Sequence, residues 1–340
     1  MDKIVFFGVG GHARYLWKQI IQSPFFQDEY IAFSDNNSKL WGKEFESINI
    51  IPPADLVQID ADAFVILSTY EKEIERQLKV ELGISEEKIY SFSDYRKKCF
   101  ARWQYDKKYK NIESDGSETL GFNTEHIVVY TAITGNYDTL KEPPFTDEKT
   151  TYVCFTDNRD LKSDKWNIEY IWDDRLDAMH LAKKVKLFPN LYFKEFETSV
   201  WVDANFNIRN DLKSYIRKYG KNKPILCFPH STRECIYDEA GTCLHLKKGV
   251  KEKVLKQIFD YYQMGYPLNN GLYEMGCIVR RHNDMTIQKI MNDWAKEIEK
   301  YSYRDQLSFP VVCWKNGFLP DICDLDLGRN DWIRFSEHKY

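Results

Sequence analysis

The sequence lacks the features that mark several classes of protein. None of its 8 cysteines forms a C-x-x-C pair, which is the spacing typical of a zinc site. No apolar run is long enough to cross a bilayer, and Met1 is followed by charged residues and a strand-like run rather than by a signal peptide. We therefore expect a cytoplasmic protein with reduced thiols, for which peripheral association with a membrane stays open.

An excess of basic charge is also lacking. The 48 basic residues are outnumbered by 52 acidic ones, which gives a formal net charge of -4, so the composition argues against a nucleic-acid partner. The 340 residues are 43% hydrophobic and 15% aromatic. This composition predicts a folded protein, and the length predicts two domains. The aromatic residues suit both a packed core and stacking against sugars or bases.

The first part of the chain alternates between strand-like and helix-like patterns. Short apolar runs occupy residues 3–7, 30–33, 63–67 and 88–92, and amphipathic stretches occupy 15–21 and 74–82. Such alternation predicts a parallel sheet, so we expect a Rossmann-like accessory domain over residues 1–96. A charged connector without a sustained period follows over 97–123, and it includes the turn-like residues 114–117.

Glycines follow the first strand of this domain. Gly8, Gly10 and Gly11 open the first helix, and Asp35 ends the second strand. This arrangement can place a phosphate at a helix N-terminus and a ribose hydroxyl at the acid. It predicts an NAD(P) site, although the third glycine of the full fingerprint is missing. The alternative is a Rossmann-like fold that binds no dinucleotide.

A second α/β pattern fills residues 124–340. Strand-like runs at 127–132, 151–155, 168–172 and 199–202 alternate with helical stretches at 177–187, 250–264 and 285–301. The last of these strands runs directly into Asp203 and Asn205, so an acid stands at the carboxyl end of a buried strand, where α/β proteins bind ligands. Oxygen ligands there predict a site for Mg²⁺ or Mn²⁺ that neutralises a leaving diphosphate. Asn205 replaces the second acid of the usual D-x-D pattern, and the alternative is an ordinary turn.

Further polar residues follow the neighbouring strands. The candidates for a nucleotide site lie after two strands and before the strand that ends at Asp203, namely Thr131, Ala132, Thr134, Gly135, Asp157, Arg175 and Lys183. Two carboxylates are candidates for the acceptor or the donor sugar. Asp305 precedes an apolar run and Glu274 lies beside a glycine-containing loop; either can act as the base in sugar transfer with inversion, and Asp305 can instead orient the donor or cap a helix with Arg304 as its partner. His230 and Arg233 are weaker candidates for binding a phosphate.

Several of these motifs occur together in one known family. Residues 128–136, the lysine-rich helix before residues 200–205, residues 230–239, and the stretch from Trp294 to 304–309 resemble a glycosyltransferase-like family that was long classed as a domain of unknown function. The family occurs in plant cell-wall and mucilage proteins and in bacterial polysaccharide loci. The resemblance covers roughly residues 125–318 and implies a GT-A fold with a nucleotide-sugar donor. Residues 7–12, 33–36 and 51–52 resemble small Rossmann-like domains found beside sugar-modifying enzymes of bacterial surface polysaccharides.

These observations favour a glycosyltransferase that moves a sugar from a nucleotide-sugar donor to a glycan or lipid-linked glycan, in capsule or O-antigen synthesis. Two alternatives remain. An NAD-dependent sugar oxidoreductase would use the N-terminal domain, although no Tyr-x-x-x-Lys motif stands out after it. A protein that binds nucleotides or glycans without turnover would explain the altered D-x-D pattern.

Overall fold

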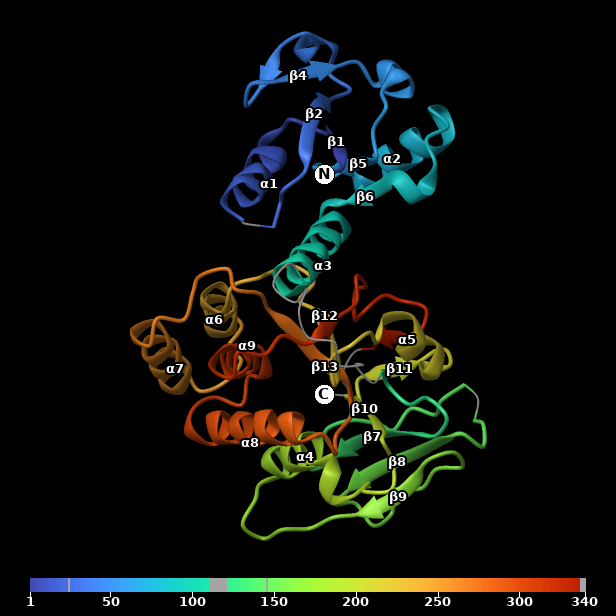
Figure 1. Ribbon diagram of the computed structural model, residues 1–340, viewed down its shortest axis with the longest axis vertical. Coiled ribbons are helices and arrows are strands. Elements are labelled where there is room, and N and C mark those ends of the chain that lie inside the picture. The colour runs from blue at the N-terminus through green and yellow to red at the C-terminus, as the bar shows by residue number, and fades with distance from the viewer. Residues whose placement is uncertain (24, 110–120, 145, 337–340) are drawn as a thin grey trace. The chain divides into compact units, whose positions relative to one another are not determined.

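The computed structural model describes residues 1–23, 25–109, 121–144 and 146–336. The chain divides into two compact units, Met1–Asn111 and Ile112–Tyr340, and each is built around its own sheet (Figure 1). Residues 114–117 of the expected connector lie outside the described residues.

The first unit is a six-stranded sheet in the order β3-β4-β2-β1-β5-β6. All its neighbouring strands are parallel except β3 and β4, which form a hairpin. The strands are β1 (Lys3–Phe7), β2 (Glu29–Ser34), β3 (Glu44–Phe45), β4 (Ile48–Ile51), β5 (Ala63–Ile66) and β6 (Ile89–Ser91), with helices α1 (Gly11–Gln22), α2 (Glu71–Arg76) and α3 (Phe92–Tyr109). The predicted Rossmann-like parallel sheet is confirmed, whereas the hairpin β3–β4 escaped the sequence pattern because its strands are so short.

Helix α3 changes the interpretation of the expected connector. Residues 97–109 of that segment are helical, although they show little amphipathic period. Tyr95 and Cys99 are buried on one side of the helix, and Arg102 donates to Asp28 at 2.7 Å. These contacts, including the one to Asp28 just before β2, hold the helix against the first unit. They join residues far apart in the sequence, so a local sequence pattern cannot predict them.

The second unit has a seven-stranded sheet in the order β14-β12-β13-β10-β7-β8-β9. Strand β13 runs antiparallel to both of its neighbours, and the other pairs are parallel. The strands are β7 (Ile127–Ile133), β8 (Thr150–Thr156), β9 (Asn167–Tyr170), β10 (Thr198–Val202), β12 (Ile225–Pro229), β13 (Tyr273–Arg280) and β14 (Asp321–Ile322), while β11 (Phe206–Ile208) and β15 (Ile333–Phe335) form a separate antiparallel pair. This mixed α/β architecture confirms the predicted fold class.

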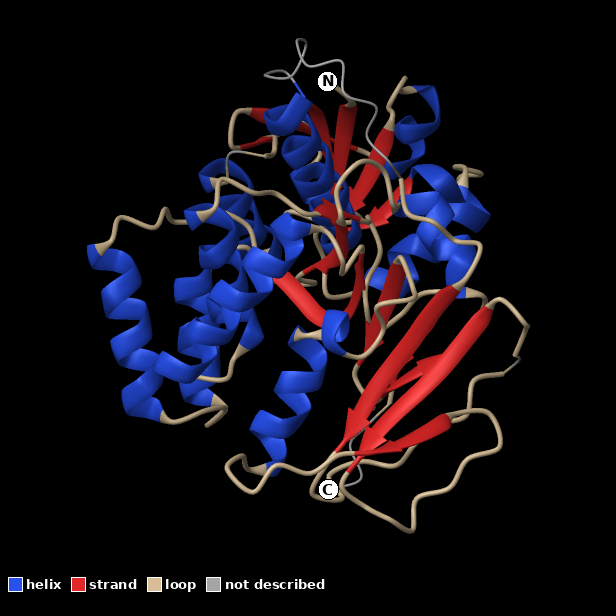
Figure 2. Ribbon diagram, turned by 60° about the horizontal axis from the view of Figure 1, so that its bottom comes forward, coloured by secondary structure: helices blue, strands red, loops and turns tan. Residues whose placement is uncertain are grey.

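Helices cover both faces of this sheet, as Figures 1 and 2 show. The helices are α4 (Ala178–Leu187), α5 (Leu212–Tyr219), α6 (Ile236–His245), α7 (Lys251–Gln263), α8 (Met285–Lys300) and α9 (Asp305–Lys315). Alternation along β10 explains the layers, because Trp201 packs with α4, α8 and α9 on one face while Val200 and Val202 pack with α5 on the other. Within the described ranges, no helix combines the length and the apolar character needed to cross a bilayer.

Candidate active site

Asp203 stands at the carboxyl end of the central strand β10. A turn closes directly after the strand, since the N–H of Phe206 donates to the Asp203 carbonyl at 3.0 Å, and the Asp203 N–H donates to the Gly276 carbonyl of β13 at 2.7 Å. The indole Nε1 of Trp201 donates to Asp203 Oδ1 at 2.5 Å. The carboxylate is thus fixed in direction although its side chain is 38% exposed.

Helix α4 brings two lysines to this carboxylate. Its N-terminus is capped by Asp177, whose side chain accepts from the His180 N–H at 2.8 Å. Lys183 and Lys186 are three residues apart and therefore lie on the same side of the helix. The ammonium group of Lys186 lies 3.2 Å from Asp203 Oδ1 and 5.5 Å from the centre of the Trp201 ring.

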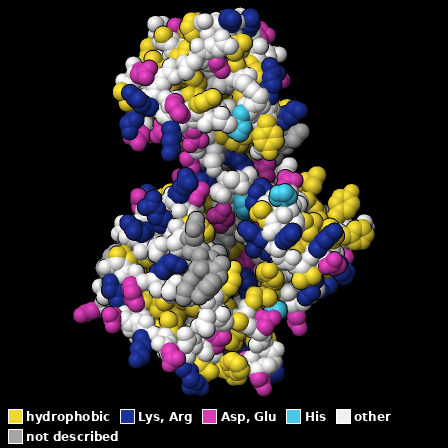
Figure 3. Space-filling view, turned by 180° about the vertical axis from the view of Figure 1, so that it is seen from behind, with side chains coloured by type: hydrophobic (Ala, Val, Ile, Leu, Met, Phe, Trp, Pro, Cys, Tyr) yellow, Lys and Arg dark blue, Asp and Glu magenta, His cyan; other side chains and the backbone are white. Residues whose placement is uncertain are grey.

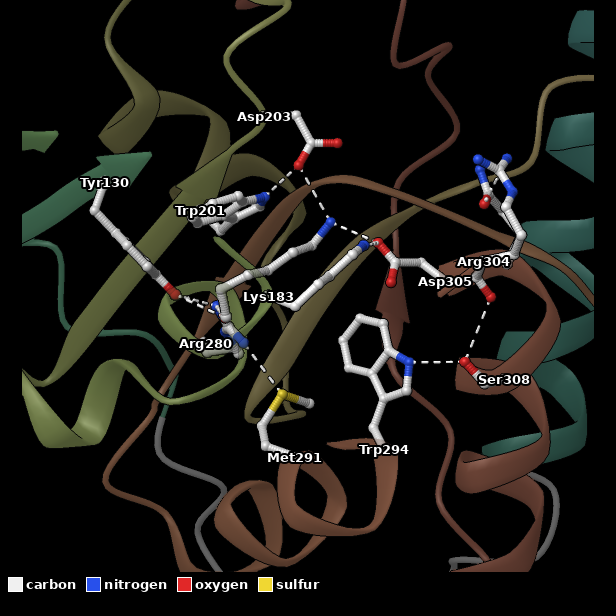
Figure 4. A network of polar contacts seen from close by, with 12 residues as sticks. Tyr130, Lys183, Trp201, Asp203, Arg280, Met291, Trp294, Arg304, Asp305 and Ser308 are labelled. Atoms are coloured by element: carbon white, nitrogen blue, oxygen red, sulfur yellow. Dashed lines mark hydrogen bonds and ion pairs between the residues drawn. The ribbon is translucent and has the colours of Figure 1, made fainter. Parts of the chain in front are cut away.

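Asp305 completes the network from the start of α9 (Figure 4). Its Oδ2 accepts from Lys183 at 2.6 Å and from Lys186 at 2.8 Å, so one ammonium group joins Asp203 to Asp305. The residue is only 8% exposed, and among the described residues its Oδ1 has no hydrogen-bond partner. The structure thus brings together Lys183, Asp203 and Asp305, and Lys186 of the same lysine-rich helix, which the sequence also favoured, joins them.

The charges of this network stabilise one another. Burial would raise the pKa of Asp305, but Lys183 and Lys186 outweigh it and hold that pKa at about 2. Burial opposes the charge on Lys186, but Asp203 and Asp305 raise its pKa above the ordinary value. Burial lowers the pKa of Lys183, with the neighbouring Lys186 adding to the effect. Asp305 therefore stays ionised at neutral pH.

A buried arginine binds the C-terminal end of helix α4, which carries Lys183 and Lys186. Arg280, at the end of β13, donates to the Lys186 carbonyl at 2.7 Å and also to the hydroxyl of Tyr130. Tyr130 donates to the same carbonyl at 3.1 Å. No local pattern marks Arg280 in the sequence, because its position depends on β13 entering the sheet between β10 and β12.

Two of the expected nucleotide residues, Thr134 and Gly135, lie in the loop after β7. The N–H of Gly135 donates to both oxygens of Asp157, at 3.0 and 2.9 Å, and Thr134 donates to the Ala178 carbonyl at 2.6 Å. Ala178 begins α4, so this loop rests on the helix that carries Lys183. Thr131 and Ala132 lie in β7 itself.

One further expected site residue lies outside this network, and another lies at the start of β13. Arg175 is bound to Asp173 through contacts of 2.9 and 3.0 Å and its side chain is 82% exposed, so it does not join the network around Asp203. Glu274 is the second residue of β13, beside the loop that contains Gly271 as the sequence predicted, and it accepts from the Ser231 N–H at 3.1 Å.

A second charged cluster surrounds Glu239 in α6. This buried carboxylate accepts from Arg233 at 2.7 Å and lies 3.8 Å from Arg304 and 3.6 Å from His230. The alternative in which Arg304 is the partner of Asp305 is therefore wrong: Arg304 faces Glu239, and the lysines of α4 take its place beside Asp305.

In the glycine turn of the first unit, the aspartate is bound by backbone groups rather than by lysine side chains. Asp35 Oδ2 accepts from the Val9 N–H at 3.0 Å, and Oδ1 accepts from the Asn37 N–H at 2.8 Å. Both oxygens thus hold backbone of the same unit. Gly10 and Gly11 have open space where a side chain would begin, and the first turn of α1 has no side-chain cap.

Among the described residues, the side chains around Asp203 form no ready-made metal site, and a hollow on α8 is not lined by any expected site residue. Within the part of the chain that the structure describes, no group of three His, Cys, Asp or Glu side chains is arranged to hold a metal ion. A hollow of about 480 Å³ lies on the outer side of α8 and is lined by Met285, Gln288, Lys289, Asn292, Asp293 and Lys296. It contains none of the expected site residues.

Two protein-family models match parts of the chain. Residues 165–320 match the model of the TOD1/MUCI70 glycosyltransferase-like domain. The match contains Lys183, Asp203 and Asp305, and it confirms the resemblance inferred from the sequence. Residues 1–90 match the model of the C2185-like N-terminal domain.

The apo structure of the bifunctional glycosyltransferase WbbM shares 10% identity with the chain, at a TM-score of 0.36, over 61% of this chain. The chain spans 40% of that structure's length. No curated protein gave a significant match.

Proposed function

We propose that the protein is a glycosyltransferase that uses a nucleotide-sugar donor, with its active site around Asp203, Lys186 and Asp305. The observation that carries the proposal is the network in which one buried ammonium group joins two carboxylates at the end of β10. This network lies within the segment that matches a glycosyltransferase-like domain, and buried, paired charges of this kind concentrate at functional sites.

The loop after β7 is the proposed place for the nucleotide. Gly135 has a φ of +62° and packs closely against Ala178 at the start of α4. The side of the loop that faces away from α4 is exposed to solvent. Asp157 fixes the loop by accepting from Gly135. Because β7 and β10 are parallel neighbours, the loop and Asp203 lie at the same edge of the sheet, as a nucleotide joined to a diphosphate requires.

A divalent cation would supply positive charge that this network lacks. Lys183, Lys186, Asp203 and Asp305 sum to no net charge, so the network leaves the charge of a diphosphate unbalanced. Both contacts to Asp203 use Oδ1, and its Oδ2 points away from them (Figure 4). We propose that Asp203 and Asn205, two residues apart in the turn after β10, would hold Mg²⁺ or Mn²⁺ together with donor phosphates, and the bound ion would neutralise the leaving diphosphate.

Asp305 is better suited to orienting the donor than to removing a proton. A general base works best with a pKa near the working pH, and the two lysines hold the pKa of Asp305 at about 2. Its unpaired Oδ1 offers an acceptor to a sugar hydroxyl group, and a buried acceptor without a partner is rare in folded proteins. Glu274, in the adjoining strand β13, remains our candidate for the base.

The acceptor that we propose is a glycan or lipid-linked glycan of a bacterial surface polysaccharide, such as capsule or O-antigen. This part rests on the sequence resemblance of both units. It predicts that transfer depends on a glycan acceptor and that donor hydrolysis without acceptor is slow.

The test measures transfer and donor hydrolysis for UDP-, GDP-, CDP- and ADP-linked sugars, with and without Mn²⁺. We expect Asp203→Ala to lower transfer roughly a hundredfold or more, because charge on the leaving group loses its stabilisation. The substitution also removes a partner of the buried Lys186 and the acceptor of Trp201, so its melting temperature is measured and transfer is compared at a temperature where the variant is folded. Asp164→Ala, at an exposed position outside the network, serves as the control.

Two outcomes would contradict the proposal. Full transfer activity in Asp203→Ala would remove the assigned site. Nucleotide binding, seen as a rise in melting temperature, without turnover of any donor would favour a protein that binds but does not catalyse.

A further inference from the structure

Helix α7 is apolar on two sides. Its inner side buries Val254 and Tyr261 in a cluster with α6 and α9. On the outer side Leu255, Phe259 and Tyr262 recur at i, i+4 and i+7, which places them along one stripe. These three side chains are 48%, 62% and 66% exposed, so each leaves a large apolar area at the surface, although the Tyr262 ring also contacts that of Tyr237.

The loop before the helix extends this surface. Leu246 and Val250 are about half exposed, and four exposed lysines alternate with the apolar positions. These lysines are Lys247, Lys248, Lys251 and Lys253. Within the described ranges none of the four takes part in an ion pair, whereas Lys256 is paired with Asp260 at 2.8 Å. Figure 3 shows hydrophobic and basic side chains side by side at this margin of the unit.

We infer that this surface, residues 246–262, binds the face of an anionic phospholipid membrane. Exposed aromatic and aliphatic side chains can enter the boundary between headgroups and acyl chains while the lysine ammonium groups remain at the phosphates. The cores of protein–protein interfaces, in contrast, are depleted of lysine. The combination of an apolar stripe with four unpaired lysines therefore favours lipid over a protein partner.

The consequence is local concentration at a membrane rather than insertion into it. The stripe is only two turns long and lies along the surface of the unit, so binding should be reversible and should weaken as salt screens the lysines. The inference does not depend on which reaction the protein catalyses, because none of these residues belongs to the network around Asp203.

The test is sedimentation of the full chain with vesicles of phosphatidylcholine alone and of phosphatidylcholine mixed with phosphatidylglycerol. We expect binding to the mixed vesicles that falls with added salt. Lys251→Gln with Lys253→Gln should weaken it roughly 25-fold, at about fivefold for each lysine near an anionic surface. Phe259→Ser should weaken it roughly tenfold without lowering the melting temperature, because the ring is already exposed.

Matched control variants distinguish binding by this surface from nonspecific effects of exposed lysines or aromatic rings elsewhere on the chain. Lys18→Gln with Lys72→Gln removes two exposed lysines of the first unit, and Tyr15→Ser removes an exposed aromatic ring there; neither should change vesicle binding. Failure to sediment with the mixed vesicles, or equal binding to both vesicle types, would overturn the inference. A concentration-dependent dimer that Phe259→Ser dissociates would assign the stripe to a second copy of the chain instead.

Discussion

Each unit of this protein places an aspartate at the end of a strand, yet the two acids are used differently. In the first unit, both oxygens of Asp35 accept backbone N–H groups of neighbouring turns. In the second unit, Asp203 accepts from a lysine that a separate helix supplies, and that lysine also reaches Asp305. The comparison shows that a strand-end acid becomes a candidate for chemistry when distant elements bring it a charged partner.

The largest effect expected from this comparison concerns Asp305. Asp305→Asn would leave two buried ammonium groups with one carboxylate between them, and we expect a loss of about 3 kcal/mol in the free energy of unfolding. Urea unfolding measures this directly. The control is Asp293→Asn, since Asp293 also holds two lysines at 3.0 Å but on the exposed side of α8; we expect at most about 1 kcal/mol there.

The pH dependence sharpens the same prediction. The pKa of Asp305 in the folded chain is about 2, which lies below the unfolded value of about 3.9. Its contribution to stability is therefore fully present above pH ~4 and declines as the pH falls toward 2. The difference between the native chain and Asp305→Asn should be constant from pH 7 to 5 and shrink below 4; a difference that shrinks already between pH 7 and 5 would contradict the charged network.

The glycine turns of the two units give the next effect. At Gly135 the backbone has a φ of +62°, and an added Cβ would lie 2.9 Å from that of Ala178. Gly135→Ala should therefore cost about 2 kcal/mol and weaken nucleotide binding, as thermal unfolding with and without UDP would show. Gly10→Ala, with open space around it, should change stability by no more than about 0.5 kcal/mol, and an equal cost at both glycines would undermine the distinction.

The smallest effect is expected at Asp35. Asp35→Asn keeps one acceptor oxygen and loses the other, so the hydrogen bond to Val9 or Asn37 is lost at a cost of about 1 kcal/mol. Sugar transfer should be unchanged. Thermal unfolding with NAD tests the alternative use of this turn, and a clear rise in melting temperature that Asp35→Asn removes would restore a dinucleotide site to the first unit.

Sequence reasoning reached further for the fold than for the site. Apolar runs located β1, β7 and β10, and amphipathic periods located α4, α7 and α8 within a residue or two. It missed the helical character of residues 97–109 and the strand β13, because packing rather than a local period forms them. It also singled out Arg175 for the nucleotide site, and the structure pairs this exposed side chain with Asp173, outside the network around Asp203.

The sequence by itself determined the two α/β units and the placement of Asp203 after a buried strand, since both follow from periods of a few residues. Only the tertiary structure decided that Lys183 and Lys186 meet Asp305, which follows them by 122 and 119 residues. It likewise decided that Arg280 lies beneath the lysine helix. Contacts between such distant residues depend on the order in which strands enter the sheet and on the helices packed against it, and no short stretch of sequence encodes that order.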